Sequence, residues 1–213
     1  MARILITSGP TRQYLDPVRY ISNASSGRMG SALATAALAL GHEVVIISGP
    51  VNIQYPEQAS IIDVVSTEDM LRESKRMFRQ CDGAIGAAAP CDYMPRFIES
   101  QKIAKTGAPL KLELVETPDV VATLGQQKQP GQWVVGFALE TENELENAKE
   151  KIRNKNLDLI VLNSLNDKGA GFGTSTNKIT FVDKNSRAKT FEVKDKSEVA
   201  ADIWKEIIDR IHA

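Results

Sequence analysis

Residues 3–48 read RILITSGPTRQYLDPVRYISNASSGRMGSALATAALALGHEVVIIS and decide the fold class. The apolar runs Arg3–Thr7 and Glu43–Ser48 are typical of buried strands. Between them, Ser25–Leu40 starts at serines, is rich in Ala, Leu and Met, and meets Gly41, which predicts a helix. A strand, a helix and a second strand in this order predict two parallel strands with the helix packed on one face.

The same alternation continues along most of the chain. It predicts helices over Thr67–Gln80 and Glu142–Asn154, and further strands over Gly83–Ala88, Trp133–Ala138 and Leu157–Leu162. We therefore expect an α/β fold, with a Rossmann-like, doubly wound, mainly parallel sheet that carries helices on both faces.

The end of the chain has a different pattern. Lys178–Val182 and Lys189–Val193 alternate polar and apolar residues around the turn residues 184–187, which predicts a late β-hairpin. Lys196–Ile211 has the apolar spacing of an amphipathic helix, and we expect it to close the fold. Because no internal repeat, low-complexity tract or clear linker divides the sequence, residues 1–213 are expected to form a single domain.

The composition of the chain excludes several classes of protein. Its 213 residues carry 26 Lys and Arg against 27 Asp and Glu, and this net charge of −1 argues against a nucleic-acid coat or a polybasic membrane binder. Two cysteines and two histidines are too few for a disulfide scaffold, a four-cysteine zinc site or a His-rich metal site. The sequence shows neither a long apolar signal region nor a membrane span, so we expect a cytoplasmic protein.

Ligands of doubly wound sheets bind beyond the carboxyl ends of the strands, which selects the loops after Thr7, Ser48, Ala88, Ala138 and Leu162. In the first loop, the glycines Gly9, Gly27 and Gly30 are spread over a long insertion, so the compact G-x-G-x-x-G turn is absent. Ser25-Ser26-Gly27 nevertheless offers N–H groups and hydroxyls to an anion at a helix start. Three arginines add positive charge: Arg12, Arg19 and Arg28. The alternative is a capped helix with solvated arginines.

Residues 7–30, TSGPTRQYLDPVRYISNASSGRMG, resemble the opening motif of the phosphopantothenoylcysteine synthetase family. Further segments agree with the family in the same order: Ala87–Tyr93, Lys102–Lys105, Thr117–Asp119, Val135–Thr141, Lys155–Asp158, Gly171–Gly173 and Asn177-Lys178. The resemblance covers nearly the whole chain. Members are often fused behind a flavin-dependent decarboxylase, and no such portion is present in this sequence. The chain therefore resembles either a free-standing synthetase or a domain taken from a fused one.

The resemblance implies a ligase of coenzyme A biosynthesis that works in two steps. The carboxylate of 4′-phosphopantothenate attacks the α-phosphate of a nucleoside triphosphate and releases pyrophosphate. The amine of cysteine then attacks the acyl nucleotide and releases the nucleoside monophosphate. The motif details are similar to bacterial members, which implies CTP rather than ATP, with Mg²⁺ to neutralise and orient the triphosphate.

The resemblance also implies a homodimer. The late hairpin Lys178–Val193 is a candidate contact, because an exposed sheet edge can pair with another chain. We expect small-molecule substrates only, with no nucleic acid and no membrane as partners.

Three residues receive catalytic roles from the resemblance. Lys102 approaches the triphosphate and stabilises charge as the acyl nucleotide forms. Asn23 holds the acyl carbonyl for attack by the amine, and Arg19 assists in the same step. The alternatives without a catalytic role are an exposed loop lysine, a turn-forming asparagine and an arginine in a surface ion pair. Ala104 stands where the family usually has a further lysine, so this chain carries fewer charges in that loop.

The resemblance assigns nucleotide binding to residues of several segments, namely Gly9, Gly86, Ala88, Asp92, Lys102, Pro118, Asp119, Val120, Val121, Phe137, Lys151 and Lys155. It assigns binding of the acyl substrate to Asn23, Ser25, Ser26, Gly27 and Ala89. Asp92 is expected to hydrogen-bond the nucleotide or to help hold its Mg²⁺, and the metal ligands otherwise stay open.

Part of this assignment can be read from the residues themselves. Thr117 and Pro118 suit the cap and first turn of a helix, whose backbone would read the edge of the base. Phe137 stacks on the base or serves as a core aromatic. Lys151 and Lys155 lie four residues apart on one helix face, where they meet phosphate or ribose, or remain solvated.

Two other functions stay open at this stage. An NAD(P)-dependent oxidoreductase would share the fold, although the compact glycine turn is absent and no Tyr-x-x-x-Lys pair is positioned for hydride chemistry. A non-catalytic nucleotide-binding module is the second alternative. We interpret Cys91 as a substitute for a small packing residue rather than as a nucleophile, because no base partner can be identified for it.

Overall fold

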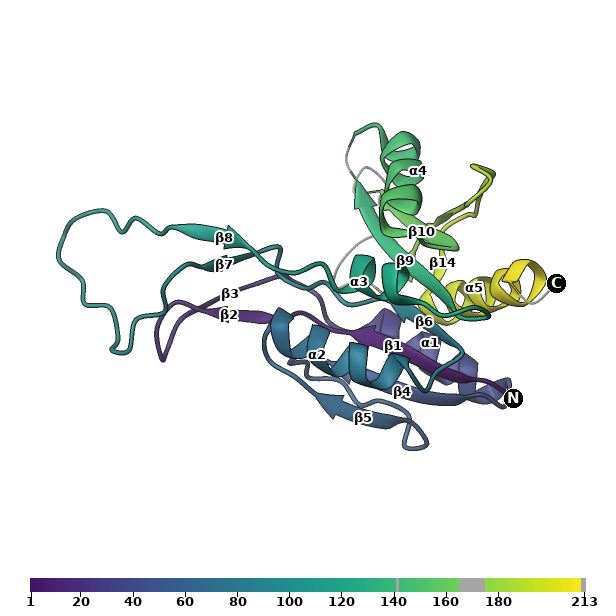
Figure 1. Cartoon of the computed structure of the whole chain (residues 1–213), viewed down its shortest axis with the longest axis horizontal. Helices are drawn as coiled ribbons and strands as arrows, with labels where there is room; N and C mark the ends of the chain where they lie inside the picture. Colours follow the sequence, from purple (N-terminus) through teal and green to yellow (C-terminus); the bar gives the residue numbers. More distant parts are fainter. Residues whose placement is uncertain (141, 165–174, 212–213) are drawn as a thin grey trace.

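An eight-stranded sheet runs through the computed structural model of the chain, which describes residues 1–140, 142–164 and 175–211. From one edge to the other its strands are β13 (Ala188–Thr190), β12 (Thr180–Asp183), β10 (Leu159–Ser164), β9 (Trp133–Glu140), β6 (Gly83–Gly86), β1 (Arg3–Ser8), β4 (Glu43–Ser48) and β5 (Ser60–Asp63). The strands from β10 to β5 are parallel, whereas β12 and β13 pair antiparallel (Figure 1). This order confirms the Rossmann-like, mainly parallel sheet and its late hairpin.

Helices cover both faces of the sheet. The first face carries α1 (Arg28–Ala39) and α5 (Lys196–Ile211), and the second carries α2 (Thr67–Phe78), α3 (Val120–Gln127) and α4 (Glu144–Lys155). Neighbouring residues of β1 serve different faces, since Ile4 packs in the core under α1 and Leu5 packs in the core under α2. Burial on both faces is the reason why the central strands are continuously apolar.

The C-terminal helix closes the fold as predicted. In α5, the indole N–H of Trp204 donates to the carbonyl oxygen of Leu33 in α1 at 3.0 Å, and the Trp204 ring packs edge-on against Trp133 of β9. Both rings are fully buried. No helix among the described residues is long and apolar enough to cross a membrane.

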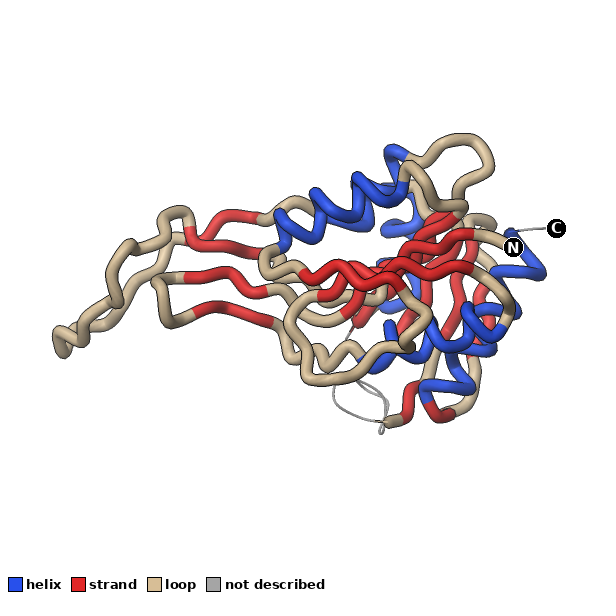
Figure 2. Tube along the Cα trace, turned by 90° about the horizontal axis from the view of Figure 1, so that it is seen from below, coloured by secondary structure: helices blue, strands red, loops and turns tan. Residues whose placement is uncertain are grey.

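Two hairpins project from the carboxyl edge of the sheet and were not predicted. One is β2 (Arg12–Tyr14) with β3 (Tyr20–Ser22), in the connection between β1 and α1. The other is β7 (Tyr93–Pro95) with β8 (Leu114–Glu116), in the connection after β6. Figures 1 and 2 show them side by side, reaching away from the sheet; we call residues 12–22 and 93–116 together the arm. A short pair, β11 (Thr176–Asn177) with β14 (Lys194–Asp195), precedes α5.

Two predicted helix starts are wrong in detail. The first helix does not begin at the serines: α1 begins at Arg28, after Gly27 in the left-handed region at φ 76°, and no side chain caps it. The cap of α3 is Asp119 rather than Thr117, because the Asp119 carboxylate accepts a hydrogen bond from the Ala122 N–H at 2.8 Å. The Thr117 hydroxyl donates instead to the carbonyl oxygen of Cys91.

Candidate active site

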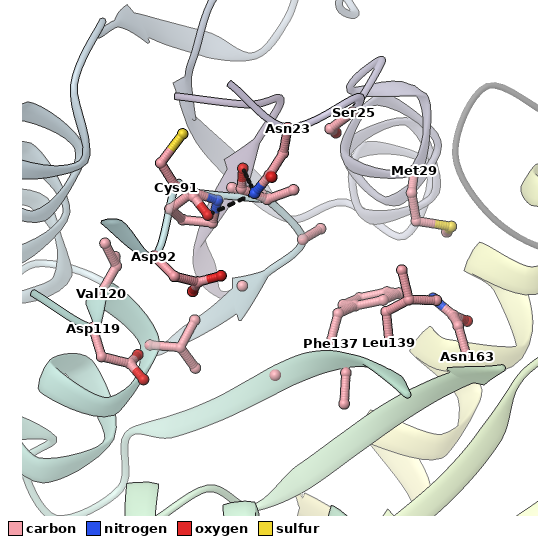
Figure 3. Close-up of a pocket in the computed structure, with 18 of the residues that line it drawn as sticks. Asn23, Ser25, Met29, Cys91, Asp92, Asp119, Val120, Phe137, Leu139 and Asn163 are labelled. Carbon is pink, nitrogen blue, oxygen red and sulfur yellow. Dashed lines mark hydrogen bonds between the residues drawn. The ribbon is translucent and has the colours of Figure 1, made fainter. Parts of the chain in front are cut away.

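A pocket of about 660 Å³ opens at the carboxyl edge of the sheet. Its walls are the segment 86–89 after β6, the segment 136–139 of β9 and the residues 23–29 that lead into α1 (Figure 3). The strand order reverses at β1, because β4 and β5 lie on one side of it and β6 lies on the other. Ligands of doubly wound folds usually bind at this reversal. The location agrees with the loops that the strand pattern selects.

Most of the residues that the sequence proposed for the site meet in this one pocket. Those that line it are Asn23, Ser25, Ser26, Gly27, Gly86, Ala88, Ala89, Asp92, Pro118, Asp119, Val120, Val121, Phe137, Lys151 and Lys155. They come from segments far apart in the chain, so their convergence is a result of the fold. The proposed residues that do not line the pocket are Gly9, Arg12, Arg19 and Lys102.

Gly9 lies behind the pocket wall. Its carbonyl oxygen accepts a hydrogen bond from the Ala89 N–H at 2.9 Å, which ties the loop after β1 to the loop after β6. Gly9 has φ 77°, and a Cβ built on it would come within 2.7 Å of the Val51 side chain. Gly9 therefore supports the wall through its backbone shape.

Arg19 and Lys102 belong to the arm. The Arg19 guanidinium donates to the Asp16 carboxylate at 2.6 Å and to the Ile103 carbonyl oxygen at 3.1 Å. Lys102 lies beside Ile103, in the wall of a separate small cavity within the arm. The two hairpins of the arm carry these side chains away from the pocket of their own chain, so the roles that the resemblance implies for them stay predictions.

Asp16 joins the two hairpins of the arm. Burial of the Asp16 carboxyl opposes its ionisation, but the N–H groups of Val18, Arg19 and Ile103 and the Arg19 guanidinium all donate to it. Their combined effect lowers the pKa of Asp16 to about 2. A carboxylate held in this way stabilises the arm only while it is ionised.

We expect Asp16→Asn to loosen the arm at neutral pH, because an amide offers one acceptor where several donors converge. The folded-state pKa lies below the ordinary value of 3.8, so the contribution of the ionised group is present above pH 4 and is lost as the pH falls from 3.8 towards 2. Amide hydrogen exchange at Val18 and Ile103 should therefore be faster in the variant at pH 7, and the difference should shrink below pH 4. Asp63→Asn, at an exposed strand position, serves as the control; equal exchange in all three proteins would contradict the role of Asp16.

Asn23 connects the chain before α1 to the loop after β6. Its amide nitrogen donates to the carbonyl oxygens of Ala89 and Pro90, at 3.2 and 2.9 Å (Figure 3). The contact holds Asn23 at the pocket rim, on the wall opposite Phe137. A polar side chain fixed from one side is suited to orient a substrate group on the other.

The N-terminus of α1 reaches the pocket because Gly30 packs directly on β1. A Cβ at position 30 would lie 2.2 Å from the Ser8 hydroxyl oxygen, so a larger residue would push the helix away. The Ser8 hydroxyl also donates to the Gly27 carbonyl oxygen at 3.1 Å. Backbone N–H groups and the helix dipole at this position favour an anion.

Lys151 and Lys155 of α4 each form an ion pair with a carboxylate. Lys151 pairs with Glu140, and Lys155 lies 2.7 Å from Asp119. Burial opposes ionisation of Glu140, but the hydrogen bonds from Lys151 and Asn147 outweigh it and lower the Glu140 pKa. A phosphate that binds either lysine must therefore exchange with, or join, an existing ion pair.

The sequence reasoning missed several lining residues on the α1 side of the pocket: Met29, Leu139, Asn163, Asn177 and Lys196. Asn163 follows the predicted strand Leu157–Leu162, so the rule about strand ends would have found it. Its side-chain oxygen is buried and accepts no hydrogen bond from any described residue. Lys196 starts α5, and nothing in the sequence places that helix end beside α1.

Comparison with known proteins now adds to this geometry. Residues 1–211 match the family described as DNA/pantothenate metabolism flavoprotein C-terminal domain. The chain belongs to this family. Membership confirms the resemblance to phosphopantothenoylcysteine synthetases and does not support the oxidoreductase alternative. The matching segment Gly171–Gly173 lies outside the described residues.

Individual relatives agree in sequence and structure. The Coenzyme A biosynthesis bifunctional protein CoaBC of Haemophilus influenzae is 40% identical over 207 residues, which are 97% of this chain and 51% of that protein. A Cysteine/Cysteine sulfinic acid decarboxylase of an unknown prokaryotic organism is 49% identical over 211 residues, 99% of this chain and 59% of that protein. The crystal structure of the C-terminal domain of a CoaBC is 38% identical, covers 99% of this chain and 97% of its own, and gives a TM-score of 0.83. The chain thus spans about half the length of the curated relatives.

Within this family fold, Cys91 occupies a packing position. The side chain is 3% exposed, and its sulfur lies 3.4 Å from the carbonyl oxygens of Thr11 and Ile21. Burial raises the pKa of the thiol. A buried, protonated thiol is a poor nucleophile, which favours the interpretation of Cys91 as a packing residue.

Proposed function

We propose that the chain joins 4′-phosphopantothenate to L-cysteine through an acyl nucleotide, with CTP as the nucleotide. The support is one pocket that brings together the N-terminus of α1, several cationic side chains and the aromatic ring of Phe137. Four of the described residues that line it are cationic, and such side chains can meet the charge of two anionic reactants. The named function of the matched CoaBC relatives agrees with this proposal.

In the first step, a carboxylate oxygen of phosphopantothenate bonds to the α-phosphorus, and the bond to the bridging oxygen of pyrophosphate breaks. Lys151 and Lys155 are the candidates to bind the triphosphate, while Val120, Val121 and Phe137 line the space for the base. Gly86 keeps this wall thin, because a Cβ there would lie 2.4 Å from the Val121 side chain and would push that side chain out of place. Positive charge is required here since both reactants are anions.

In the second step, the cysteine nitrogen bonds to the acyl carbon, the bond to the nucleotide oxygen breaks, and the nucleoside monophosphate leaves. The ammonium of cysteine loses two protons as it becomes an amide N–H; the departing phosphate oxygen can accept one of them, and solvent the other. Asn23 orients the acyl carbonyl, and Ser25, Ser26, Gly27 and Ala89 bind the acyl chain. Arg19 and Lys102 lie in the arm. They can act as proposed only if the arm reaches the pocket of a second copy of the chain, or bends towards the pocket of its own chain.

Mg²⁺ fits this site as a companion of the triphosphate. Among the described residues no group of three His, Cys, Asp or Glu side chains stands together to form a metal cage. Mg²⁺ is commonly held by one or two carboxylates and the phosphates of a nucleotide, and the exposed Asp92 carboxylate in the pocket is the candidate protein ligand. When bound, the metal neutralises phosphate charge and orients the α-phosphate.

The experiment that tests the function supplies 4′-phosphopantothenate, cysteine and Mg²⁺ with CTP or ATP in turn, and measures the mass of the product and pyrophosphate release. We expect 4′-phosphopantothenoylcysteine, with CTP as the better nucleotide. Nucleotide binding without pyrophosphate release would instead support a binding module. Release of CO₂ from cysteine would support the activity in the name of the decarboxylase relative, of which this chain matches 59%.

We also propose a homodimer, with the arm as its main contact. Large apolar side chains are exposed along the arm, among them Phe97 at 74%, Ile98, Leu110 and Tyr93. The late hairpin offers less, since the exposed residues of its edge strand β13 are Ala188, Lys189 and Thr190. Light scattering should give twice the chain mass, and Phe97→Asp should lower the dimer affinity at least tenfold. A monomer at all concentrations would contradict this proposal.

A further inference from the structure

The loop from Ala89 to Asp92 forms part of the pocket wall. The Asn23 amide donates to the carbonyl oxygens at the beginning of this loop, and the Thr117 N–H donates to that of Asp92 at its end, at 2.9 Å. Asp92 is exposed, and its carboxylate points into the pocket, whereas the Cys91 sulfur points away from it (Figure 3). The position of the Asp92 carboxylate therefore depends on what holds the backbone of Cys91.

Two threonine hydroxyls bind both backbone polar groups of Cys91. The Cys91 N–H donates to the Thr11 hydroxyl oxygen at 2.8 Å, and the Thr67 hydroxyl donates to the Cys91 carbonyl oxygen at 3.2 Å. Both threonines are fully buried, and their hydroxyl oxygens lie 2.8 Å apart. Since Thr67 gives its one proton to the carbonyl oxygen, Thr11 donates to Thr67, and each hydroxyl proton has an acceptor. The three residues thus form a closed ring of hydrogen bonds.

A third hydroxyl binds at the same place. The Thr117 hydroxyl donates to the Cys91 carbonyl oxygen at 2.6 Å. We call Thr11, Thr67 and Thr117 the threonine clamp; they belong to the loop after β1, the first turn of α2 and the segment between β8 and α3. Buried hydrogen bonds whose donors and acceptors are all used hold a single backbone arrangement, and Asp92 is the next residue in the chain.

The threonine clamp lies where the arm joins the sheet. Thr11 directly precedes β2, Asp92 directly precedes β7, and Thr117 directly follows β8, so a movement of the arm would act on all three. Thr67 differs from them, because it starts a helix that Ser66 caps and that packs on the sheet. A side chain on a rigid element is suited to keep a neighbouring site in place.

We propose that Thr67 positions the Asp92 carboxylate, through the backbone of Cys91, for the nucleotide and its Mg²⁺. This inference rests on the proposed function, in which Asp92 is the candidate metal ligand. Thr67 does not line the pocket, so it is a positioning residue and not a catalytic one. Residues that fix a metal-binding carboxylate from outside commonly change metal affinity or activity about 10- to 100-fold when they are replaced.

The test compares Thr67→Val, Thr67→Ser, Asp92→Asn and the double variant Thr67→Val/Asp92→Asn with wild type. Valine has nearly the shape of threonine without its hydroxyl, and serine keeps the hydroxyl. Thr180→Val is the matched control, because the Thr180 hydroxyl also shares a hydrogen bond with a threonine hydroxyl, that of Thr190 at 3.0 Å, and lies outside the pocket. Calorimetry measures CTP binding in the presence of Mg²⁺, and initial rates give the KM for CTP. Thermal melting verifies that each variant is folded.

We expect Thr67→Val to weaken CTP binding about tenfold, with a matching rise in the KM for CTP. Thr67→Ser and Thr180→Val should resemble wild type. In the Asp92→Asn background, Thr67→Val should cause no further loss, because the carboxylate that Thr67 positions is then absent. If Thr67→Val does not fold, Thr117→Val gives the same comparison, since it removes the other hydroxyl from the Cys91 carbonyl oxygen.

Wild-type affinity in a folded Thr67→Val would overturn the inference. An equal loss with and without the Asp92 carboxylate would also overturn it, because that result indicates a general loosening of the fold. A loss of CTP binding that depends on Asp92, in a protein that forms no 4′-phosphopantothenoylcysteine, would instead contradict the proposed function and leave the positioning role of Thr67 intact.

Discussion

Asn23→Asp is expected to lower product formation about 100- to 1000-fold, the loss typical when a positioned hydrogen-bond donor is removed from an active site. The Asn23 amide donates to the Ala89 and Pro90 carbonyl oxygens. Aspartate has no N–H for these carbonyls, and its negative charge would repel both of them and the anionic substrates. The side chain would turn away, and the acyl carbonyl would lose the group that orients it.

The step at which the Asn23→Asp reaction stops shows in which half-reaction Asn23 acts. Since Asn23 is proposed to act in the second step, pyrophosphate release should continue for about one turnover while the acyl nucleotide accumulates, as detected by acid quenching and mass measurement. Asn156→Asp is the matched control, because the Asn156 amide also donates to a backbone carbonyl, that of Gly125 at 2.8 Å, and does not line the pocket. Wild-type progress curves for Asn23→Asp would show that the side chain has no role in either step.

The sequence was sufficient for the sheet because its central strands are buried on both faces. Glu43–Ser48 was predicted to the residue as β4, and the other central strands were placed within two residues at each end, since continuous apolar runs carry that signal. The strand β5 was missed, because three of the four residues of Ser60–Asp63 are exposed and the strand lies at the sheet edge. Short edge strands carry little periodicity.

The arm escaped prediction for a related reason. Its strands are three residues long, and its two hairpins are joined by hydrogen bonds between Ile103 and the side chains of Asp16 and Arg19, over 87 and 84 positions. No local pattern encodes such contacts. The consequence for the site is that Arg19 and Lys102, assigned by motif, lie in the arm and not in the pocket of their own chain.

The pocket itself could be predicted only in part. Residues that belong to long motifs, such as Asn23 and Asp92, were found because the motif names them. Lys196 was not, since its place depends on how α5 packs against α1, a contact between residues more than 150 positions apart. Tertiary packing, rather than local sequence, decides which charges share the α1 end of the pocket.

Gly49→Ala is expected to lower the free energy of unfolding by about 3 kcal/mol, which corresponds to a melting temperature lower by roughly 6 to 12 °C. A Cβ at position 49 would lie 1.6 Å from the carbonyl oxygen of Pro10. Both the added Cβ and the Pro10 oxygen are fixed to the backbone, so no side-chain rotation relieves the clash. The Gly49 N–H also donates to the Ser8 carbonyl oxygen at 2.9 Å, so the chain at Gly49 is held in place.

The strain of Gly49→Ala would reach the pocket through a short series of contacts. Pro10 and Ala89 form an isolated β-bridge, in which the Gly9 carbonyl oxygen accepts a hydrogen bond from the Ala89 N–H. A displaced Pro10 therefore shifts the pocket wall that Asn23 holds. Thermal denaturation measures the stability loss, and the KM values measure the shift. Gly131→Ala is the control: Gly131 has φ 89° and no heavy atom within 4 Å of the added Cβ, so only backbone strain of about 1 kcal/mol is expected. Equal melting temperatures for the two variants would mean that the loop after β4 yields easily, and that its contact with Pro10 does not set the shape of the pocket wall.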